Sequence, residues 1–236
     1  MKKFIAILVF ASLVMLSANA QTKWKSTVDS LVLNAPNYNE YNEVRRDVFR
    51  ILPVSSSDII FLGDSITDRC EISDLFGNPD IKNRGISGDR VRWMFDRYDV
   101  IARGKPAKLF ILAGVNDLRS GKTRSRDLCF MLAELITRFR RMSPDTKIYL
   151  QSIFPMNLDK PAQEKFKGST LNQRIDNCNA WLARWCAGND VTWINVADAL
   201  KGPDGQLNEN YTVDGLHPNG LGYLVWKDVI ETYVME

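Results

Sequence analysis

Short apolar segments alternate with longer stretches of helical periodicity along most of this chain. Five segments have the length and the aliphatic or aromatic content of buried strands: 58–62, 80–83, 108–113, 147–152 and 191–196. Because helical stretches separate them, the pattern predicts β-α units around a five-stranded parallel sheet. The expected fold class is therefore α/β.

Three helices are expected where apolar residues recur every three or four positions. The first covers 125–142 and ends before Pro144, and the second covers 171–187 and ends at Gly188. A third is expected to begin at Pro218, because proline suits the first position of a helix. Its expected inner stripe consists of Leu221, Leu224, Val225 and Val229. The tryptophans expected to pack in the core or at its rim are Trp93, Trp181 and Trp226.

The first twenty residues have the pattern of an export signal. Lys2 and Lys3 precede an apolar run from Phe4 to Leu16, and a cleavage pattern follows at 18–20. We expect residues 1–20 to be removed and the mature chain to be periplasmic or secreted, without stable insertion in the membrane. An uncleaved signal anchor is the alternative.

The remaining chain is long enough for one sizeable core and short for two α/β domains. We expect residues 56–236 to form that single domain and 21–55 to be an N-terminal extension of unclear role, with a helix ending at Leu52. The segment 154–170 has prolines and mixed charges without periodicity, so a loop or short helix beside the ligand site is expected there.

Charge and cysteine spacing narrow the classes of partner and cofactor. The chain carries a net charge of +3, and two of its cations are the lysines of the signal. The mature protein is thus nearly neutral, which gives no electrostatic reason to expect nucleic acid as a partner. No C-x-x-C pattern is present, which counts against structural zinc. The cysteines, expected to be buried free thiols, are Cys70, Cys129, Cys178 and Cys186.

Ser65 is a candidate nucleophile because it follows the first strand and precedes a helix. Ligands bind at this carboxyl edge of open α/β sheets, where backbone N–H groups are available. The alternative is that Ser65 only caps the helix, since residues 65–68 have the pattern of a capping box. The segment by itself does not decide between these interpretations.

His217 is the only histidine in the chain, so it is the one histidine that could act as a base for Ser65. It lies in Asp214-Gly215-Leu216-His217-Pro218, and this spacing lets the Asp214 carboxylate hold one ring nitrogen while the other faces the serine. Two further turns, at 83–89 and 114–117, follow predicted strands and can supply hydrogen-bond donors for developing negative charge.

Four motifs together resemble the blocks of the SGNH, or GDSL-type, hydrolase family. They are Phe61-Leu62-Gly63-Asp64-Ser65, Gly88-Asp89, Gly114-Val115-Asn116-Asp117 and Asp214-Gly215-Leu216-His217-Pro218. The resemblance implies a flavodoxin-like, three-layer α/β/α sandwich and a serine esterase without a metal or organic cofactor. It also implies a triad of Ser65, Asp214 and His217, with an oxyanion hole formed by the Ser65 N–H, the Gly88 N–H and the Asn116 side chain. Gly85 is the competing candidate for the glycine donor. We expect Gly88 instead, because the family pattern has a glycine followed by Asp, and Asp89 follows Gly88.

The chain looks most like the platelet-activating-factor acetylhydrolase-like and carbohydrate-esterase branches. This resemblance implies removal of short acyl groups, commonly acetyl, here from extracytoplasmic carbohydrates. A lysophospholipase or thioesterase acting on lipid acyl esters is the alternative enzyme, and a non-catalytic glycan-binding module is the alternative of another class. The motifs do not indicate an oligomeric state.

Several arginines lie within five residues of a block residue and are candidates for binding an acidic sugar or another anionic ester. Solvated surface arginines are the alternative interpretation. The candidates are Arg69, Arg84, Arg90 and Arg119.

Overall fold

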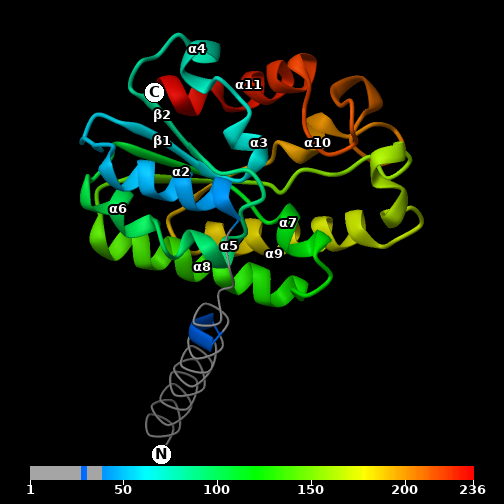
Figure 1. Ribbon diagram of the computed structural model, residues 1–236, viewed down its shortest axis with the longest axis horizontal. Helices are drawn as coiled ribbons and strands as arrows, with labels where there is room; N and C mark the ends of the chain where they lie inside the picture. The colour runs from blue at the N-terminus through cyan, green and yellow to red at the C-terminus, as the bar shows by residue number, and fades with distance from the viewer. Residues whose placement is uncertain (1–27, 31–38) are drawn as a thin grey trace, which may run out of the picture. The chain divides into compact units, whose positions relative to one another are not determined.

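The computed structural model describes residues 28–30 and 39–236. The chain divides after Pro36 into two units, and residues 28–30, which are helical, belong to the first. The export signal expected at 1–20 lies outside the described residues. Within the described ranges, no helix is long and apolar enough to cross a membrane. The second unit, of which the structure describes residues 39–236, is shown in Figure 1.

A parallel five-stranded sheet forms the centre of this unit. Its strands are β1 (Ile59–Gly63), β2 (Ile81–Gly85), β3 (Lys108–Leu112), β4 (Lys147–Gln151) and β5 (Thr192–Ile194). Their spatial order is β2-β1-β3-β4-β5, and each neighbouring pair is parallel. This is the flavodoxin-like order, in which the chain changes direction between β1 and β3. The predicted α/β class and five-stranded parallel sheet are confirmed.

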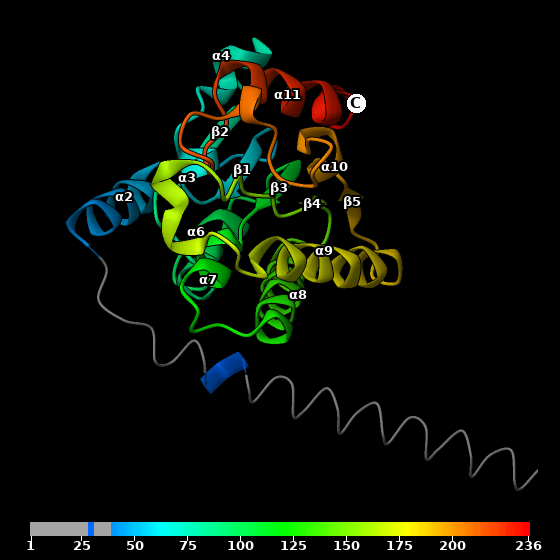
Figure 2. The same ribbon diagram turned by 90° about the vertical axis from the view of Figure 1, so that its right-hand side faces the viewer.

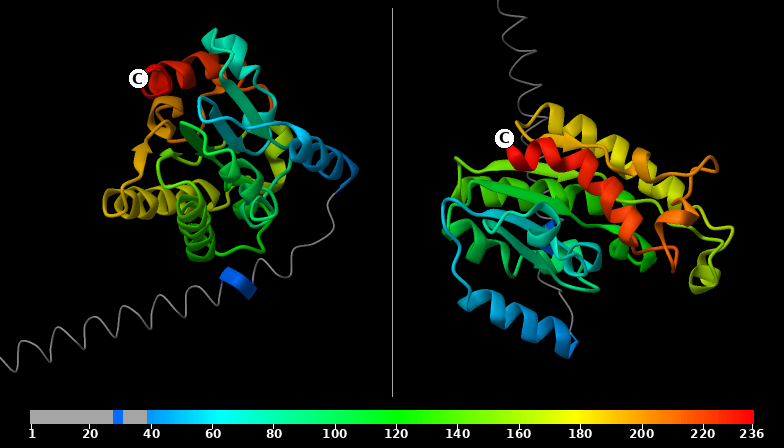
Figure 3. Two further views of the ribbon diagram at one scale, coloured as in Figure 1. Left: turned by 90° about the vertical axis from the view of Figure 1, so that its left-hand side faces the viewer. Right: turned by 90° about the horizontal axis from the view of Figure 1, so that it is seen from above.

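Helices cover both faces of the sheet and complete the expected three layers. Figure 2 shows α6, α7, α8 and α9 below the sheet and α4, α10 and α11 above it, and Figure 3 gives the same arrangement from two further sides. The bounds are α2 Glu40–Ile51, α3 Ser65–Asp68, α4 Ile72–Phe76, α5 Val91–Met94, α6 Tyr98–Arg103, α7 Val115–Arg119, α8 Ser125–Met142, α9 Leu171–Ala187, α10 Ala197–Leu200 and α11 Gly220–Met235, with 3₁₀ helices η1 Pro161–Phe166 and η2 Glu209–Tyr211.

Aromatic side chains connect the central strands to the last helix. The rings of Phe61, Phe110 and Tyr149 stack across β1, β3 and β4, with centroids 4.7 and 4.4 Å apart. Trp226 of α11 meets Phe61 edge-on at 5.7 Å and donates to the Gln151 side chain at 2.6 Å. Buried aromatic pairs add to the stabilisation that burial alone provides. This cluster fixes α11, and with it the loop that precedes the helix, on the sheet.

The last helix differs from its prediction in two respects. Its first residue is Gly220, capped by the Asn219 side chain, whereas Pro218 lies outside it and pairs with Thr212 in an isolated β-bridge. The expected inner stripe is wrong, because Leu221 is 58% exposed. The buried face instead consists of Gly222, Trp226, Ile230 and Val234. The helix has apolar residues of its own on most of its sides, so their periodicity could not identify the face that packs on the sheet.

The other two predicted helices, 125–142 and 171–187, have the expected bounds as α8 and α9. The second strand, by contrast, runs on to Gly85, so the turn expected at 83–89 begins only at Ile86. Trp93 and Trp226 are buried and Trp181 is half-buried, as expected. All four cysteines are buried, as predicted.

Candidate active site

Ser65 is the first residue of α3, directly beyond the carboxyl end of β1. The helix is capped by Asp64, whose carboxylate accepts a hydrogen bond from the Ile66 N–H at 3.0 Å. The alternative that Ser65 is only a helix cap is therefore wrong. The Ser65 Oγ atom instead lies 2.9 Å from the Nε2 atom of His217. Ser65 is buried, with only 5% of its surface exposed to solvent.

His217 and Asp214 lie in the loop that leads into α11. The His217 Nδ1 atom is 2.6 Å from one carboxylate oxygen of Asp214. The other oxygen accepts hydrogen bonds from the N–H groups of Leu216 and His217, at 2.9 and 2.8 Å. Asp214 thus holds both the backbone and the ring of His217. The structure brings the three predicted residues into one hydrogen-bonded row, as the proton transfer expected of them requires.

The charge states of this pair suit a neutral base beside a carboxylate. Partial burial works to raise the pKa of Asp214, but hydrogen bonds from His217 and Leu216 outweigh it and lower the pKa to about 2. Burial lowers the pKa of His217 below its ordinary value, although Asp214 works in the opposite direction. At neutral pH the ring is therefore uncharged. With Nδ1–H donated to Asp214, Nε2 is left as an acceptor for the Ser65 hydroxyl proton.

Gly88 is better placed than Gly85 to donate to a ligand. The Gly85 N–H donates to the Asn83 side chain at 2.8 Å, and Gly85 packs so closely on α3 that a Cβ atom there would lie 2.3 Å from the Asp68 nitrogen. Gly88 has a left-handed φ of +80° and open space around its Cβ position. Among the described residues, none accepts a hydrogen bond from the Gly88 N–H. A side chain at Gly88 would meet strain rather than a clash.

Asn116 lies on α7, next to the loop that contains Gly88. Its Nδ2 atom donates one hydrogen bond to the Asp89 carbonyl at 3.1 Å. An amide nitrogen carries two hydrogens, so a second donor remains for a ligand. Gly88 and Asn116 also line the same hollow, which has a volume of about 190 Å³. The resemblance to the family implied both residues, and the fold places them at one opening.

Basic residues form another wall of this hollow. Two of the four candidate arginines, Arg90 and Arg119, line it, and so do Ser120, Lys165 and Phe166. Arg84 is not among the lining residues. It is 5% exposed, and its guanidinium lies over the Phe49 ring, 5.1 Å from the centroid. The expectation that Arg84 binds substrate is wrong, because its position on strand β2 directs the side chain toward the N-terminal helix.

The segment 154–170 lies beside the site, as expected, and it contributes residues that the sequence did not single out. Gln163 of η1 donates to the Asp214 carbonyl at 2.8 Å and accepts from Arg119 at 3.2 Å. The next turn of η1 supplies Lys165 and Phe166 to the hollow. Only the position of this segment after β4, at the carboxyl edge of the sheet, could have indicated these residues.

A larger cavity of about 520 Å³ lies between the segments 157–160 and 202–210. None of the predicted site residues lines it. It adjoins the His217 loop, because Gly215 of that loop packs closely on Asn157 of the cavity wall. A Cβ atom on Gly215 would lie 2.4 Å from the Asn157 carbonyl oxygen. The smaller hollow, by contrast, is lined by four of the predicted site residues: Gly88, Arg90, Asn116 and Arg119.

Two buried carboxyl groups, Asp64 and Asp117, lie beneath the site. Each accepts one backbone hydrogen bond, from Ile66 at 3.0 Å and from Val91 at 3.1 Å. Burial raises the pKa of both groups to about 7, and the nearby Asp89 carboxylate adds to the effect. Both groups therefore retain their proton well above the usual range for a carboxylic acid.

We expect Asp117→Asn to change how stability depends on pH. The folded-state pKa of about 7 lies above the ordinary 3.8, so the stabilisation from a protonated Asp117 is complete below about pH 4 and is lost as pH rises through 7. The variant keeps an acceptor for Val91 without a titrating charge. Urea denaturation gives the free energy of unfolding of both proteins at each pH. The value for the variant minus the value for the wild type should rise by a few kcal/mol between pH 4 and 7, since one pKa unit corresponds to about 1.4 kcal/mol.

The exposed Asp47 on α2 supplies the matched control for that measurement. Its side chain is 83% exposed, so Asp47→Asn should leave the difference between variant and wild type flat over the same pH range. A flat difference for Asp117→Asn as well would mean that Asp117 titrates like a surface carboxylate.

Solved structures with the same fold come from several bacteria. A protein from Streptococcus pneumoniae, described as a platelet activating factor, superposes with a TM-score of 0.72 at 28% identity, covering 95% of this chain and 99% of the other. An acetylxylan esterase from Geobacillus stearothermophilus gives a TM-score of 0.60 at 18% identity, covering 78% and 96%. At that identity the second likeness shows the fold alone.

Curated relatives are longer than this chain. An N-acylneuraminate cytidylyltransferase from Escherichia coli is 25% identical over 203 residues, which are 84% of this chain and 44% of the relative. The chain thus spans less than half the length of that protein. The model of the GDSL-like lipase/acylhydrolase family matches residues 61–225, well over half of the chain. The match takes in Ser65, the Gly88 and Asn116 loops, and the Asp214 and His217 loop, so the chain belongs to the GDSL-like lipase/acylhydrolase family.

Proposed function

We propose that this protein is a serine esterase that hydrolyses short-chain acyl esters, above all acetyl esters on carbohydrates, through an acyl-enzyme. The observation that carries the proposal is the row Ser65, His217 and Asp214, with donor–acceptor distances of 2.9 and 2.6 Å. A serine hydroxyl becomes a useful nucleophile when a neutral base accepts its proton. The uncharged His217 ring next to Ser65 supports that role.

In the first half of the reaction, the Ser65 Oγ atom attacks the ester carbonyl while His217 Nε2 takes the hydroxyl proton. Asp214 holds the Nδ1–H and stabilises the imidazolium that forms. The carbonyl oxygen gains negative charge, and the N–H groups of Ser65 and Gly88 and the free amide hydrogen of Asn116 are the donors we assign to it. The alcohol leaves with the proton from His217, and the acyl group remains on Ser65.

In the second half, water replaces the alcohol. His217 accepts a proton from the water as it attacks the acyl carbonyl, and the same three donors stabilise the oxyanion again. Collapse of the intermediate breaks the bond to Ser65 Oγ, which recovers its proton from His217. The carboxylic acid departs, and the enzyme returns to its starting state without any other reactant.

The small hollow favours a short acyl group on a charged carbohydrate. Its volume of about 190 Å³ is well below the roughly 300 to 1,000 Å³ typical of sites for larger ligands. Arg90, Arg119 and Lys165 make its wall cationic, a setting that favours a carboxylate over a long alkyl chain. The cytidylyltransferase relative is named for N-acylneuraminate, a carboxylated sugar, which supports an acidic carbohydrate as the alcohol part of the ester.

We further propose that the enzyme acts outside the cytoplasm, either in the periplasm or after secretion. The basis is the N-terminal pattern of two lysines, an apolar run and a small-residue cleavage pattern. Carbohydrate esters of the cell surface or of the surroundings would then be within reach.

Rates on a panel of esters test this function. We expect p-nitrophenyl acetate to be hydrolysed faster than p-nitrophenyl octanoate, because the hollow is small and cationic. Among acetylated sugars, those that carry a carboxylate should have the higher kcat/KM. Arg119→Ala and Arg90→Ala should reduce this preference severalfold while acetate release from a neutral sugar changes little. Liberated acetate and p-nitrophenolate provide the measurements.

Each alternative function has its own signature in the same panel. Rates that rise with acyl chain length would favour the lipid-directed hydrolase. An unchanged preference in both arginine variants would contradict the acidic-sugar assignment and leave the esterase itself intact. Absence of turnover on every ester, together with no labelling of Ser65 by a fluorophosphonate, would favour the glycan-binding module.

A further inference from the structure

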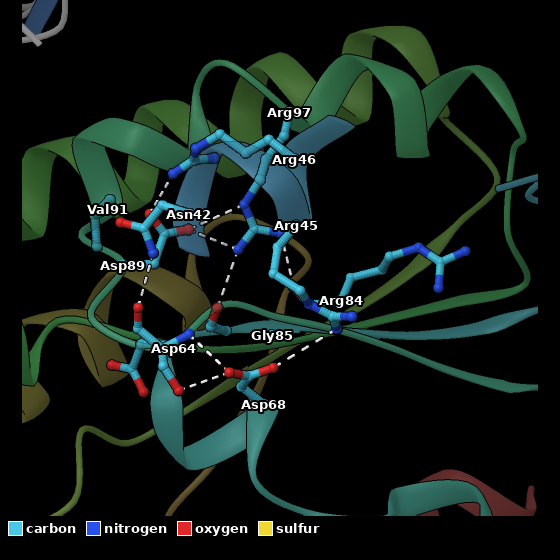
Figure 4. Close-up of polar contacts among 12 residues, drawn as sticks. Asn42, Arg45, Arg46, Asp64, Asp68, Arg84, Gly85, Asp89, Val91 and Arg97 are labelled. Carbon is cyan, nitrogen blue, oxygen red and sulfur yellow. Dashed lines mark hydrogen bonds and ion pairs between the residues drawn. The ribbon is translucent and has the colours of Figure 1, made fainter. Parts of the chain in front are cut away.

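Helix α2 lies outside the stretch 61–225 that matches the family model, yet its side chains reach the loops of the candidate active site. Three of its residues are buried or nearly so on this side: Asn42, Arg46 and Phe49. Figure 4 shows the polar contacts between α2 and the residues around Asp89. A segment that sequence patterns left without a role is thus in contact with the oxyanion loop.

Asp89 is a buried carboxylate between two arginines. Its side chain is fully buried; Arg46 donates to one oxygen at 2.5 Å, and Arg97 donates to the other at 2.8 and 3.0 Å. Arg46 and Arg97 are themselves 2% and 3% exposed. Buried charges of this kind need both their partners and good geometry. The carboxylate can therefore adopt few other orientations while both arginines are in place.

Arg97 extends the same network to the ends of two strands. Its guanidinium also donates to the carbonyl oxygens of Arg84, at 2.7 Å, and Gly63, at 3.0 Å. Gly63 ends β1 just before Ser65, and Arg84 is the penultimate residue of β2 just before the Gly88 loop. Arg97 therefore fixes Asp89 relative to both catalytic segments. Arg46 restrains the other oxygen of the same carboxylate.

The backbone of Asp89 connects this network to the oxyanion donors. Asp89 follows Gly88 directly, and its carbonyl accepts the hydrogen bond from Asn116 Nδ2. A displacement of the Asp89 backbone would move the neighbouring Gly88 and the hydrogen-bonded Asn116 amide together. Two of the three donors assigned to the oxyanion, those of Gly88 and Asn116, thus depend on one residue, which α2 helps to hold.

Other side chains of α2 contact the same loop and helix α3, which begins with Ser65. Asn42 donates to the Ser87 carbonyl at 2.8 Å, and Tyr41 donates to the Asp68 carboxylate at 2.6 Å. The N–H and hydroxyl of Ser87 donate to the same carboxylate oxygen, at 2.9 and 2.6 Å. Asp68 ends α3, which begins at Ser65. Helix α2 therefore joins the oxyanion loop to the nucleophile helix.

We propose that Arg46 is a positioning residue for ester hydrolysis, which through Asp89 sets the oxyanion donors Gly88 and Asn116 relative to Ser65. The proposal rests on the esterase function proposed above. It makes α2 part of the functional unit rather than an extension of it. Pre-organised donors stabilise a transition state because they need no reorientation during the reaction, so even a small displacement lowers kcat.

Kinetics of full-length variants on p-nitrophenyl acetate test the proposal. Arg46→Ala should lower kcat about 10- to 100-fold, as misplacement of catalytic groups by up to 1 Å does, with KM nearly unchanged. Arg46→Lys, which keeps the charge, should recover part of the loss. The matched control is Arg50→Ala, one turn along α2, where an exposed arginine pairs with exposed Asp47 at 3.7 Å. Its kcat should equal that of the wild type.

A double-mutant cycle separates positioning from a general structural effect. If Arg46 acts through the oxyanion donors, Arg46→Ala should cost much less in an Asn116→Ala background than in the wild type. Losses that multiply fully would overturn the proposal, as would equal kcat values for Arg46→Ala and the wild type. If Arg46→Ala does not fold, the cycle is run with Arg46→Lys and judged by the same criterion. An inactive wild type would instead count against the esterase function on which the proposal rests.

Discussion

Replacing Ser65 or His217 by alanine is expected to abolish ester hydrolysis almost completely, with a loss in kcat of about 10⁶-fold. Ser65 supplies the atom that carries the acyl group, and the chain contains no second histidine to accept its proton. The double variant Ser65→Ala/His217→Ala should be little worse than either single variant, because the two side chains act as one unit. Initial rates on p-nitrophenyl acetate measure all three losses.

The folded state of these variants can be checked independently of activity. Neither substitution removes a side chain of the aromatic core around Trp226, so the thermal midpoint and the circular dichroism spectrum should stay close to those of the wild type. A His217→Ala variant that kept more than about a thousandth of the wild-type kcat would contradict the proposed base. Labelling by a fluorophosphonate should disappear in Ser65→Ala.

Asn116→Ala is expected to lower kcat about 10²- to 10³-fold, the usual cost of removing one donor to an oxyanion. Its side chain has one hydrogen bond, to the Asp89 carbonyl, and one amide hydrogen left for the reacting oxygen. KM should change little, because this bond is formed mainly in the transition state. Steady-state kinetics on the acetate ester give both constants.

Asn116→Asp is the informative companion variant. It keeps the size of the side chain but replaces both N–H donors with a carboxylate oxygen, which repels negative charge on the substrate. We expect a loss at least as large as for alanine. An Asn116→Asp variant with activity near that of the wild type would mean that the side chain only fills space, and the assigned oxyanion donor would be wrong.

The sequence predicted the sheet and the longest helices because their signals are local. Strands β1 and β3 are fully buried and contain the continuous apolar runs 59–62 and 109–112, and the helices α8 and α9 stop at residues that disfavour helix. The short helices α4, α6 and α10 escaped prediction, and α7 was expected to be a turn, since four to six residues carry too little periodicity. The inner face of α11 was assigned incorrectly because packing on the aromatic core, and not periodicity, orients it.

The site was predictable where single motifs supply the residues, and less so where the fold brings distant residues together. Ser65, Asp214 and His217 follow from motif spacing and from the single histidine. Arg84 was assigned by its nearness in sequence to Gly88, whereas alternation along β2 turns its side chain away from the hollow. The ion pair between Arg46 and Asp89 joins positions 43 residues apart, and no local pattern records such a contact.

The four buried thiols described above make the protein a convenient host for a single reporter group. All four thiols are at most 5% exposed, so a maleimide dye can scarcely reach them, and burial also raises the pKa of Cys70 and Cys186 to about 12. Val213 is 81% exposed and precedes Asp214 in the chain. A Val213→Cys variant would therefore offer one readily labelled position beside the His217 loop, and the fluorescence of the attached dye would follow the arrival of substrate without help from a chromogenic leaving group.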